Sequence, residues 1–96
     1  MSEAIQRLHA TIHGRVQGVG FRYFVAEQAN QFKLTGWVRN RYDRTVETVA
    51  EGHKENLEGF LAALERGPSA ANVTRVESNW EEATEEFTTF KIRMTG

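Results

Sequence analysis

The sequence predicts an α/β protein of the α+β sandwich type, with two helices on one face of a mostly antiparallel sheet. Three observations predict it. Two segments carry apolar residues at the three- and four-residue spacing of a helix. Five other segments have the residue pattern of strands, several of them with apolar and polar residues in alternation. Composition is that of a folded protein, because 40% of the 96 residues are hydrophobic and 26% are charged. This length predicts one domain spanning residues 1–96.

The first strand and the first helix follow one another closely. Residues Gln6–Gly14 alternate, with Leu8, Ala10 and Ile12 on one face. After a loop at Gly14–Gly20 the period changes to that of a helix, which we expect to run from Phe21 to about Lys33. Its apolar stripe consists of Phe21, Phe24, Val25, Ala29 and Phe32.

The middle of the chain predicts a hairpin and the second helix. Strands are expected at Gly36–Arg41 and Thr45–Gly52, joined by a tight turn at Tyr42–Arg44. Leucine and phenylalanine at helical spacing then predict a helix over Lys54–Glu65. Gly67-Pro68 supplies its stop.

Two further strands complete the order. We expect the fourth at Val73–Trp80 and a fifth at Phe90–Thr95, where apolar and polar residues alternate. The acidic segment between them, Glu81–Glu86, is expected to be a loop. The first four strands and both helices match the split β-α-β pattern of ferredoxin-like folds.

Composition excludes several classes of protein. With no cysteine, the chain has neither a disulfide scaffold nor a thiolate zinc site. No apolar run approaches the about 18 residues of a membrane span. The first ten residues lack the apolar core of a secretory signal, so we expect a cytoplasmic protein without a membrane partner.

The net charge of −1 hides an asymmetry between the two parts of the chain. Residues 1–44 carry seven basic and three acidic groups, whereas residues 45–96 carry five basic and ten acidic groups. Nine of the twelve basic residues are arginine, whose planar fork suits phosphate and carboxylate. A solvated surface and an anion site in the first part are both compatible with this distribution.

The segment Gly14–Arg22 joins a strand end to a helix start. Glycines at 14, 18 and 20 let a ligand approach the backbone, whose amides can converge on an anion beside the helix N-terminus. Arg22 in the first helical turn is unfavourable for the isolated helix, and a bound dianion would reverse that sign. The spacing fits neither the dinucleotide nor the nucleotide-triphosphate loop. A plain glycine-bearing connection with an exposed arginine explains the spacing equally well.

Asn40 is the second candidate. It shares a strand face with Val38, and asparagine is a poor strand former, so either a turn role or a ligand role explains it. His9 and His13 lie on one strand face without a third ligand, so no metal site is expected.

Four segments resemble the acylphosphatases. Gly14–Arg22 resembles the first signature of that family and Gly36–Asn40 the second, at a typical separation. Val46–Gly52 and Gly67–Ala70 are similar to later segments of the family, so the resemblance spans nearly the whole chain. The family has the ferredoxin-like sandwich that periodicity predicts.

The resemblance implies hydrolysis of the carboxyl-phosphate bond of a small acyl phosphate, giving a carboxylate and inorganic phosphate without metal or cofactor. It places the phosphate-binding arginine at Arg22, the water-positioning asparagine at Asn40 and a supporting threonine at Thr45. The amides that would hold the phosphate belong to Arg15, Val16, Gln17, Gly18, Val19, Gly20 and Phe21. A monomer is expected. The sequence departs from the family at Asp43-Arg44, where Asp-Gly is common, which puts the turn geometry in question.

Two other functions compete with this one. The same fold occurs as a module that handles carbamoyl phosphate in hydrogenase-maturation carbamoyltransferases. Ferredoxin-like sheets also bind RNA through exposed aromatic residues on central strands. The first strand offers none, and the net charge of −1 is unlike that of nucleic-acid binders, so no nucleic-acid partner is expected.

Overall fold

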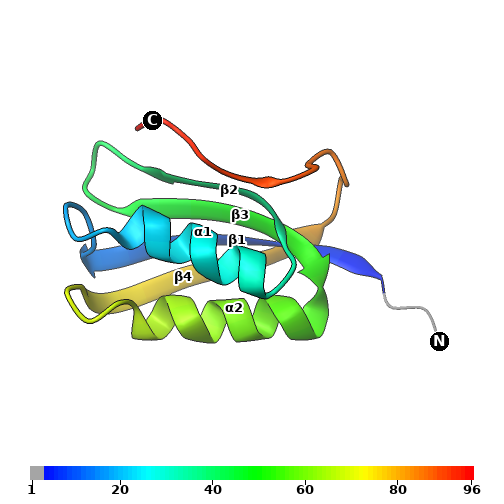
Figure 1. Ribbon diagram of the computed structural model, residues 1–96, viewed down its shortest axis with the longest axis horizontal. Helices are drawn as coiled ribbons and strands as arrows, with labels where there is room; N and C mark the ends of the chain where they lie inside the picture. Colours follow the sequence, from blue (N-terminus) through cyan, green and yellow to red (C-terminus); the bar gives the residue numbers. More distant parts are fainter. Residues whose placement is uncertain (1–3) are drawn as a thin grey trace.

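A computed structural model describes residues 4–96 as a five-stranded sheet with two helices packed on one face (Figure 1). The elements follow the predicted order and are β1 (Ile5–Arg15), α1 (Phe21–Gln31), β2 (Thr35–Asn40), β3 (Val46–His53), α2 (Lys54–Arg66), β4 (Asn72–Glu82) and β5 (Phe90–Ile92). The α+β sandwich predicted from the sequence is thereby confirmed.

The strands lie in the order β4-β1-β3-β2-β5. The pairs β1–β3, β1–β4 and β2–β3 are antiparallel, and β5 adds to the edge of β2 in parallel. The sheet is therefore mixed, with the split β-α-β arrangement in its first four strands. Strand β3 lies between β1 and β2 and is antiparallel to both. The carboxyl ends of β1 and β2 therefore lie at the same end of the sheet, where Ile12 and Asn40 both pair with Val46.

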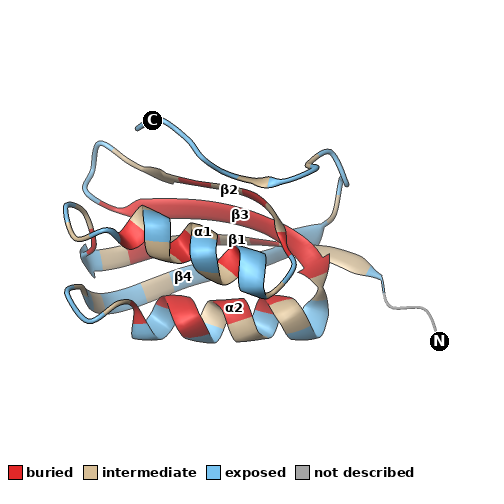
Figure 2. Cartoon of the chain, viewed as in Figure 1, coloured by how far each residue is buried: buried red, intermediate tan, exposed pale blue. Residues whose placement is uncertain are grey.

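The core lies between the sheet and the helices (Figure 2). Leu8, Ala10 and Ile12 of β1 are buried as their alternation predicts, because successive strand residues point to opposite faces. Each helix buries one stripe against them. The buried helix residues are Phe21, Val25, Ala29, Leu57, Phe60, Ala63 and Leu64.

Several element boundaries differ from the prediction. Glu81 and Glu82 belong to β4 instead of a loop, because β1 continues far enough to pair with them. Helix α1 ends at Gln31, since Lys33 is in the left-handed region with φ 59°. Regular β5 pairing ends at Ile92, although the Arg93 N–H still donates to the Val38 carbonyl over 2.8 Å.

A β-bulge at Gly14 ends the regular part of β1 and aims the chain into the following loop. The register with β4 shifts between His13 and Gly14, and Gly14 has φ 123°. A Cβ at this position would collide with the backbone carbonyl of Asn72. Glycine is therefore required here, at the point where the strand leads into the candidate site.

Candidate active site

The loop between β1 and α1 is anchored at both ends by buried side chains. Val16 and Phe21 are each 1% exposed and belong to the core. Between them, Gly18 and Gly20 are exposed and adopt left-handed conformations with φ 74° and 75°. The anchors fix the ends of the loop, and the glycines turn its peptide groups at the surface.

The loop and the start of α1 present a run of unused backbone donors. The first helical hydrogen bond runs from the Phe24 N–H to the Gly20 carbonyl over 3.1 Å. From Gln17 through Tyr23, no backbone N–H donates to an acceptor within residues 4–96. Such groups carry partial positive charge and lie beside the positive end of the helix dipole. The arrangement can bind an oxyanion.

Arg22 is the second residue of α1 and half-buried. It forms no ion pair or hydrogen bond in the described part of the chain, and the first turn of α1 holds no acidic residue. A cation at a helix N-terminus costs about 0.3–1 kcal/mol. One negatively charged ligand could therefore pair with the Arg22 guanidinium and accept hydrogen bonds from the unused amides.

The side chain of Gln17 joins this loop to the hairpin between β2 and β3. Its amide nitrogen donates to the Arg41 carbonyl over 2.8 Å and to the Thr45 carbonyl over 2.9 Å. The sequence assigned Gln17 a backbone role only. No local pattern signals this bridge, because its partners lie 24 and 28 residues away along the chain.

Asn40 ends β2, directly before the hairpin that Gln17 holds. It lies two residues after the fully buried Val38, on the same face of the strand. Its side-chain carbonyl oxygen is buried without a hydrogen-bond partner among the described residues. A buried acceptor left without a partner costs about 1–3 kcal/mol. A water molecule or a ligand that donates a hydrogen bond to this oxygen would remove that cost.

Thr45 stabilises the turn that precedes β3. Its hydroxyl donates to Oδ1 of Asp43 over 2.6 Å, and its N–H donates to the same oxygen over 3.1 Å. These hydrogen bonds lower the pKa of Asp43. The hydroxyl is thus directed at Asp43, and an influence of Thr45 on Asn40 has to act through the turn.

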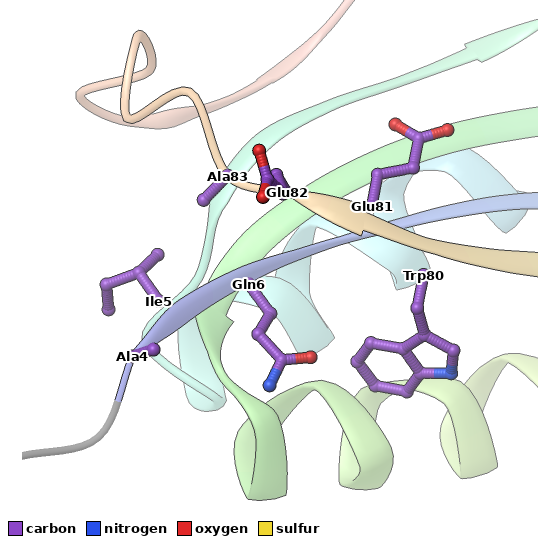
Figure 3. A pocket seen from close by; sticks show the side chains of 7 residues that line it. All are labelled: Ala4, Ile5, Gln6, Trp80, Glu81, Glu82 and Ala83. Atoms are coloured by element: carbon purple, nitrogen blue, oxygen red, sulfur yellow. The ribbon is translucent and has the colours of Figure 1, made fainter.

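A hollow of about 380 Å³ lies where the loop meets the hairpin. Its lining residues are Gly14, Arg15, Val16, Gln17, Gly18 and Arg44. A second hollow, of about 520 Å³, lies where β1 and β4 pair, between Ala4–Gln6 and Trp80–Ala83 (Figure 3). The ionisable side chains lining that second hollow are Glu81 and Glu82, which repel anions. Of the two hollows, only the one at the loop suits an anion.

The face of the sheet without helices carries paired charges. The Glu47 carboxylate accepts hydrogen bonds from Arg39 and Arg41 over 2.9 Å and lies 2.7 Å from His9. Burial alone would raise the pKa of Glu47, but the hydrogen bonds from these three partners outweigh it and lower the pKa.

Glu51 has a similar environment. It accepts from Arg7 over 2.8 Å and from the backbone N–H groups of Thr84 and Glu85. Burial alone would raise the pKa of Glu51, but the hydrogen bonds from Thr84, Arg7 and Glu85 outweigh it and lower the pKa. His9 and His13, the pair considered for metal binding, each lie beside a glutamate. The residues from 4 to 96 contain no group of three or more side chains suited to hold a metal.

The fold is a small α+β sandwich, and the loop before α1 presents backbone N–H groups without acceptors in the described chain. A search against family models matches the acylphosphatase family over residues 8–92. The chain is 49% identical over 90 residues to the acylphosphatase of Moorella thermoacetica, covering 94% of this chain and 96% of that protein. This chain belongs to the acylphosphatase family.

Solved structures agree with this assignment. The acylphosphatase of Bacillus subtilis superposes with a TM-score of 0.89 at 40% identity, over 92% of this chain and 98% of that one. Full-length HypF in its phosphate- and nucleotide-bound form also matches, with a TM-score of 0.89 and 30% identity over 99% of this chain and 13% of that chain. No described helix is long and apolar enough to cross a membrane.

Proposed function

We propose that this chain hydrolyses small acyl phosphates, with the phosphate held by the amides of the loop and by Arg22. The observation that carries the proposal is the unbroken run of unused N–H groups from Gln17 to Tyr23, which includes the half-buried, unpaired Arg22. A phosphoryl group satisfies both requirements at once. Its oxygens accept from the amides, and the guanidinium fork binds it by charge-assisted hydrogen bonds.

Asn40 positions the attacking water in this proposal. Its unpartnered carbonyl oxygen can accept a hydrogen from a water molecule, whose oxygen lone pair then points at phosphorus. The water oxygen bonds to phosphorus while the bond from phosphorus to the acyl oxygen breaks. The electron pair leaves with the carboxylate, and the water proton passes to a phosphate oxygen.

This reaction requires little from acidic or basic side chains. The leaving carboxylate has a conjugate acid of pKa about 4, so it departs without a general acid. Phosphoryl transfer depends mainly on positioning and charge stabilisation, which the loop amides and Arg22 supply. We therefore propose a reaction without metal or cofactor.

The remaining predicted residues support this site. Gln17 fixes the loop against the hairpin, and Thr45 with Asp43 fixes the turn after Asn40. We propose that these contacts keep the phosphate loop and the water-positioning amide at a constant separation. The backbone of the loop in this scheme comes from Arg15, Val16, Gly18, Val19, Gly20 and Phe21.

A binding module for RNA remains the competing function. The central strands β1 and β3 present Arg7, His9, Glu47 and Glu51 on the face without helices, and they contain no phenylalanine, tyrosine or tryptophan to stack on a base. The proposal therefore excludes nucleic acid as a partner. A gel shift with single-stranded RNA at low salt tests this, and binding there would revive the alternative.

We also propose that the chain acts as a cytoplasmic monomer. Light scattering of the purified protein tests the oligomeric state. Fractionation of the source cells tests the location. A dimer, or recovery with the membrane fraction, would correct these two points without affecting the chemistry.

The test of the activity is hydrolysis of benzoyl phosphate in EDTA by the wild type, Arg22→Gln and Asn40→Ala. Rapid turnover that both substitutions abolish supports the proposal. No turnover by folded wild type would leave a phosphate-binding domain. Hydrolysis of carbamoyl phosphate alone would favour the module of a larger carbamoyltransferase.

A further inference from the structure

The turn between β2 and β3 holds Arg44 in a left-handed backbone conformation that is unfavourable for a residue with a side chain. The Arg41 N–H donates to the Thr45 carbonyl over 2.9 Å, and the Arg44 N–H donates to the Arg41 carbonyl over 3.1 Å. This is a three-residue hairpin loop, in which the last loop residue is left-handed and glycine is preferred. Arg44 occupies that position with φ 76°.

Arg44 differs from the other two described residues with positive φ that are not glycine. Lys33 closes the C-terminal end of α1, where Leu34 donates to the Ala29 carbonyl. The N–H of Glu85 is held by the buried Glu51 carboxylate. Each of these conformations has a local reason. Arg44 keeps a long charged side chain where glycine would be less strained, and such strain is characteristic of ligand sites.

Arg44 is one of the residues that line the hollow at the loop, together with Arg15. Both arginines are exposed, and neither forms an ion pair in the described chain. The nearest carboxylate in sequence is Asp43, whose Oδ1 accepts from Thr45 and whose Oδ2 lies 4.0 Å from Nε of Arg41. The hollow is therefore lined by two uncompensated positive charges.

The hollow shares Gln17 and Gly18 with the run of unused amides, so in the proposed function it adjoins the phosphate and can take the part of the substrate beyond it. One wall of the hollow is the loop from Gly14 to Gly18. The backbone N–H groups from Gln17 to Tyr23 in and after this loop have no acceptor in the described chain. The other wall of the hollow is the hairpin that Gln17 holds against the loop. At about 380 Å³ it falls within the range of about 300–1,000 Å³ typical of small-molecule sites.

We propose that Arg44 and Arg15 form a second anionic subsite, so that this chain prefers acyl phosphates whose acyl group carries another negative charge, such as a carboxylate. The inference rests on the proposed function, because it assigns the acyl end of the same substrate. An uncharged hydrocarbon acyl group, such as the phenyl ring of benzoyl phosphate, offers the two arginines no anionic acceptor. An acyl carboxylate gains one or two charge-assisted hydrogen bonds there.

The test compares two rigid substrates of nearly equal reactivity, 4-carboxybenzoyl phosphate and benzoyl phosphate. The measured quantity is the ratio of their kcat/KM values. For the wild type we expect a preference for the charged substrate that decreases as salt is raised. In Arg44→Gln the ratio should fall about three- to fivefold, the size of an exposed ion pair.

Two matched variants serve as controls. Arg44→Lys keeps the charge and should retain most of the ratio. Lys91→Gln removes one positive charge from β5, outside the hollow, and should leave the ratio unchanged. An equal ratio in wild type and Arg44→Gln, or an equal fall in Lys91→Gln, overturns the subsite. Failure of the wild type to hydrolyse either substrate would instead refute the proposed function.

Discussion

Arginines occur in two regions of this molecule under opposite conditions. On the helix-free face of the sheet, Arg7 pairs with Glu51, while Arg39 and Arg41 pair with Glu47. At the loop end, Arg15, Arg22 and Arg44 have no carboxylate partner in the described chain. Charges that neutralise one another within the protein stabilise the fold, whereas charges left without a partner are available to a ligand. Arg66 and Arg93 also lack an ion pair in the described chain, but only Arg15, Arg22 and Arg44 belong to the loop or to the hairpin that Gln17 joins to it, which supports the proposed site.

The largest expected effect comes from removing the unpaired charge at the helix start. Arg22→Gln should lower kcat/KM for benzoyl phosphate by about 10²–10³-fold, the cost of losing one principal electrostatic group. Because the cation is unfavourable at a helix N-terminus, the free energy of unfolding should stay constant or rise slightly. Steady-state kinetics and urea denaturation measure both quantities. A near-normal rate would contradict the role of Arg22.

Asn40→Ala should act on turnover more than on binding. We expect kcat to fall about 10²-fold, since positioning of the nucleophile supplies several kcal/mol, while KM changes little. Asn40→Asp is a matched variant that keeps the size but adds a charge beside the phosphate. The reverse pattern, a raised KM with normal kcat, would make Asn40 a substrate anchor.

The paired region should respond in stability instead. Glu47→Gln removes one carboxylate facing His9, Arg39 and Arg41, and should lower the free energy of unfolding by about 2–3 kcal/mol at neutral pH. Activity per folded molecule should change far less than in Arg22→Gln. Urea denaturation at pH 7 measures the loss, and an unchanged stability would show that the pairing contributes nothing.

The same carboxylate sets a pH dependence. The pKa of Glu47 is lowered in the folded state, so its contribution is present above the unfolded pKa of about 4.3 and is lost as pH falls through the folded value. The stability difference between wild type and Glu47→Gln should therefore shrink as the solution is acidified below about pH 4. A stability difference between wild type and Glu47→Gln that grows on acidification would contradict a lowered pKa of Glu47 in the folded protein.

The smallest expected effect is a gain. Arg44→Gly relieves a left-handed conformation that costs about 1–2 kcal/mol, and loses about 0.4–1 kcal/mol to the greater freedom of the unfolded chain. The variant should be more stable by up to about 1.5 kcal/mol, while its selectivity for a charged acyl group declines. Thermal denaturation measures the gain. A destabilised Arg44→Gly would mean that the side chain contributes to the fold itself.

Local patterns predicted most of the fold. The alternation of Leu8, Ala10 and Ile12 and the apolar stripe beginning at Phe21 identified the buried faces, because burial imposes the period of each element. The parallel pairing of β5 with β2 and the extension of β4 to Glu82 were not predicted, since both depend on partners far away along the chain. The predicted ends at about Lys33 and at Thr95 were too late, since α1 ends at Gln31 before the left-handed Lys33 and regular β5 pairing ends at Ile92.

The candidate site was predicted unevenly. The glycines at 18 and 20 indicated an exposed anion loop, and the structure places both in left-handed conformations. The bridge from Gln17 to the hairpin and the unpartnered oxygen of Asn40 arise only when the chain has folded. Thr45 was expected to support Asn40, and its observed partner is Asp43, an interaction within the turn itself.

The measurement that tests the central claim most directly is a titration of the isotope-labelled protein with inorganic phosphate, followed by the backbone amide signals in NMR spectra. We predict that shifts concentrate at Gln17–Tyr23, where the amides lack acceptors, and vanish in Arg22→Gln. Amides beside Glu47 and Glu51 should stay unchanged. Shifts spread over the helix-free face, with none at Gln17–Tyr23, would contradict the account.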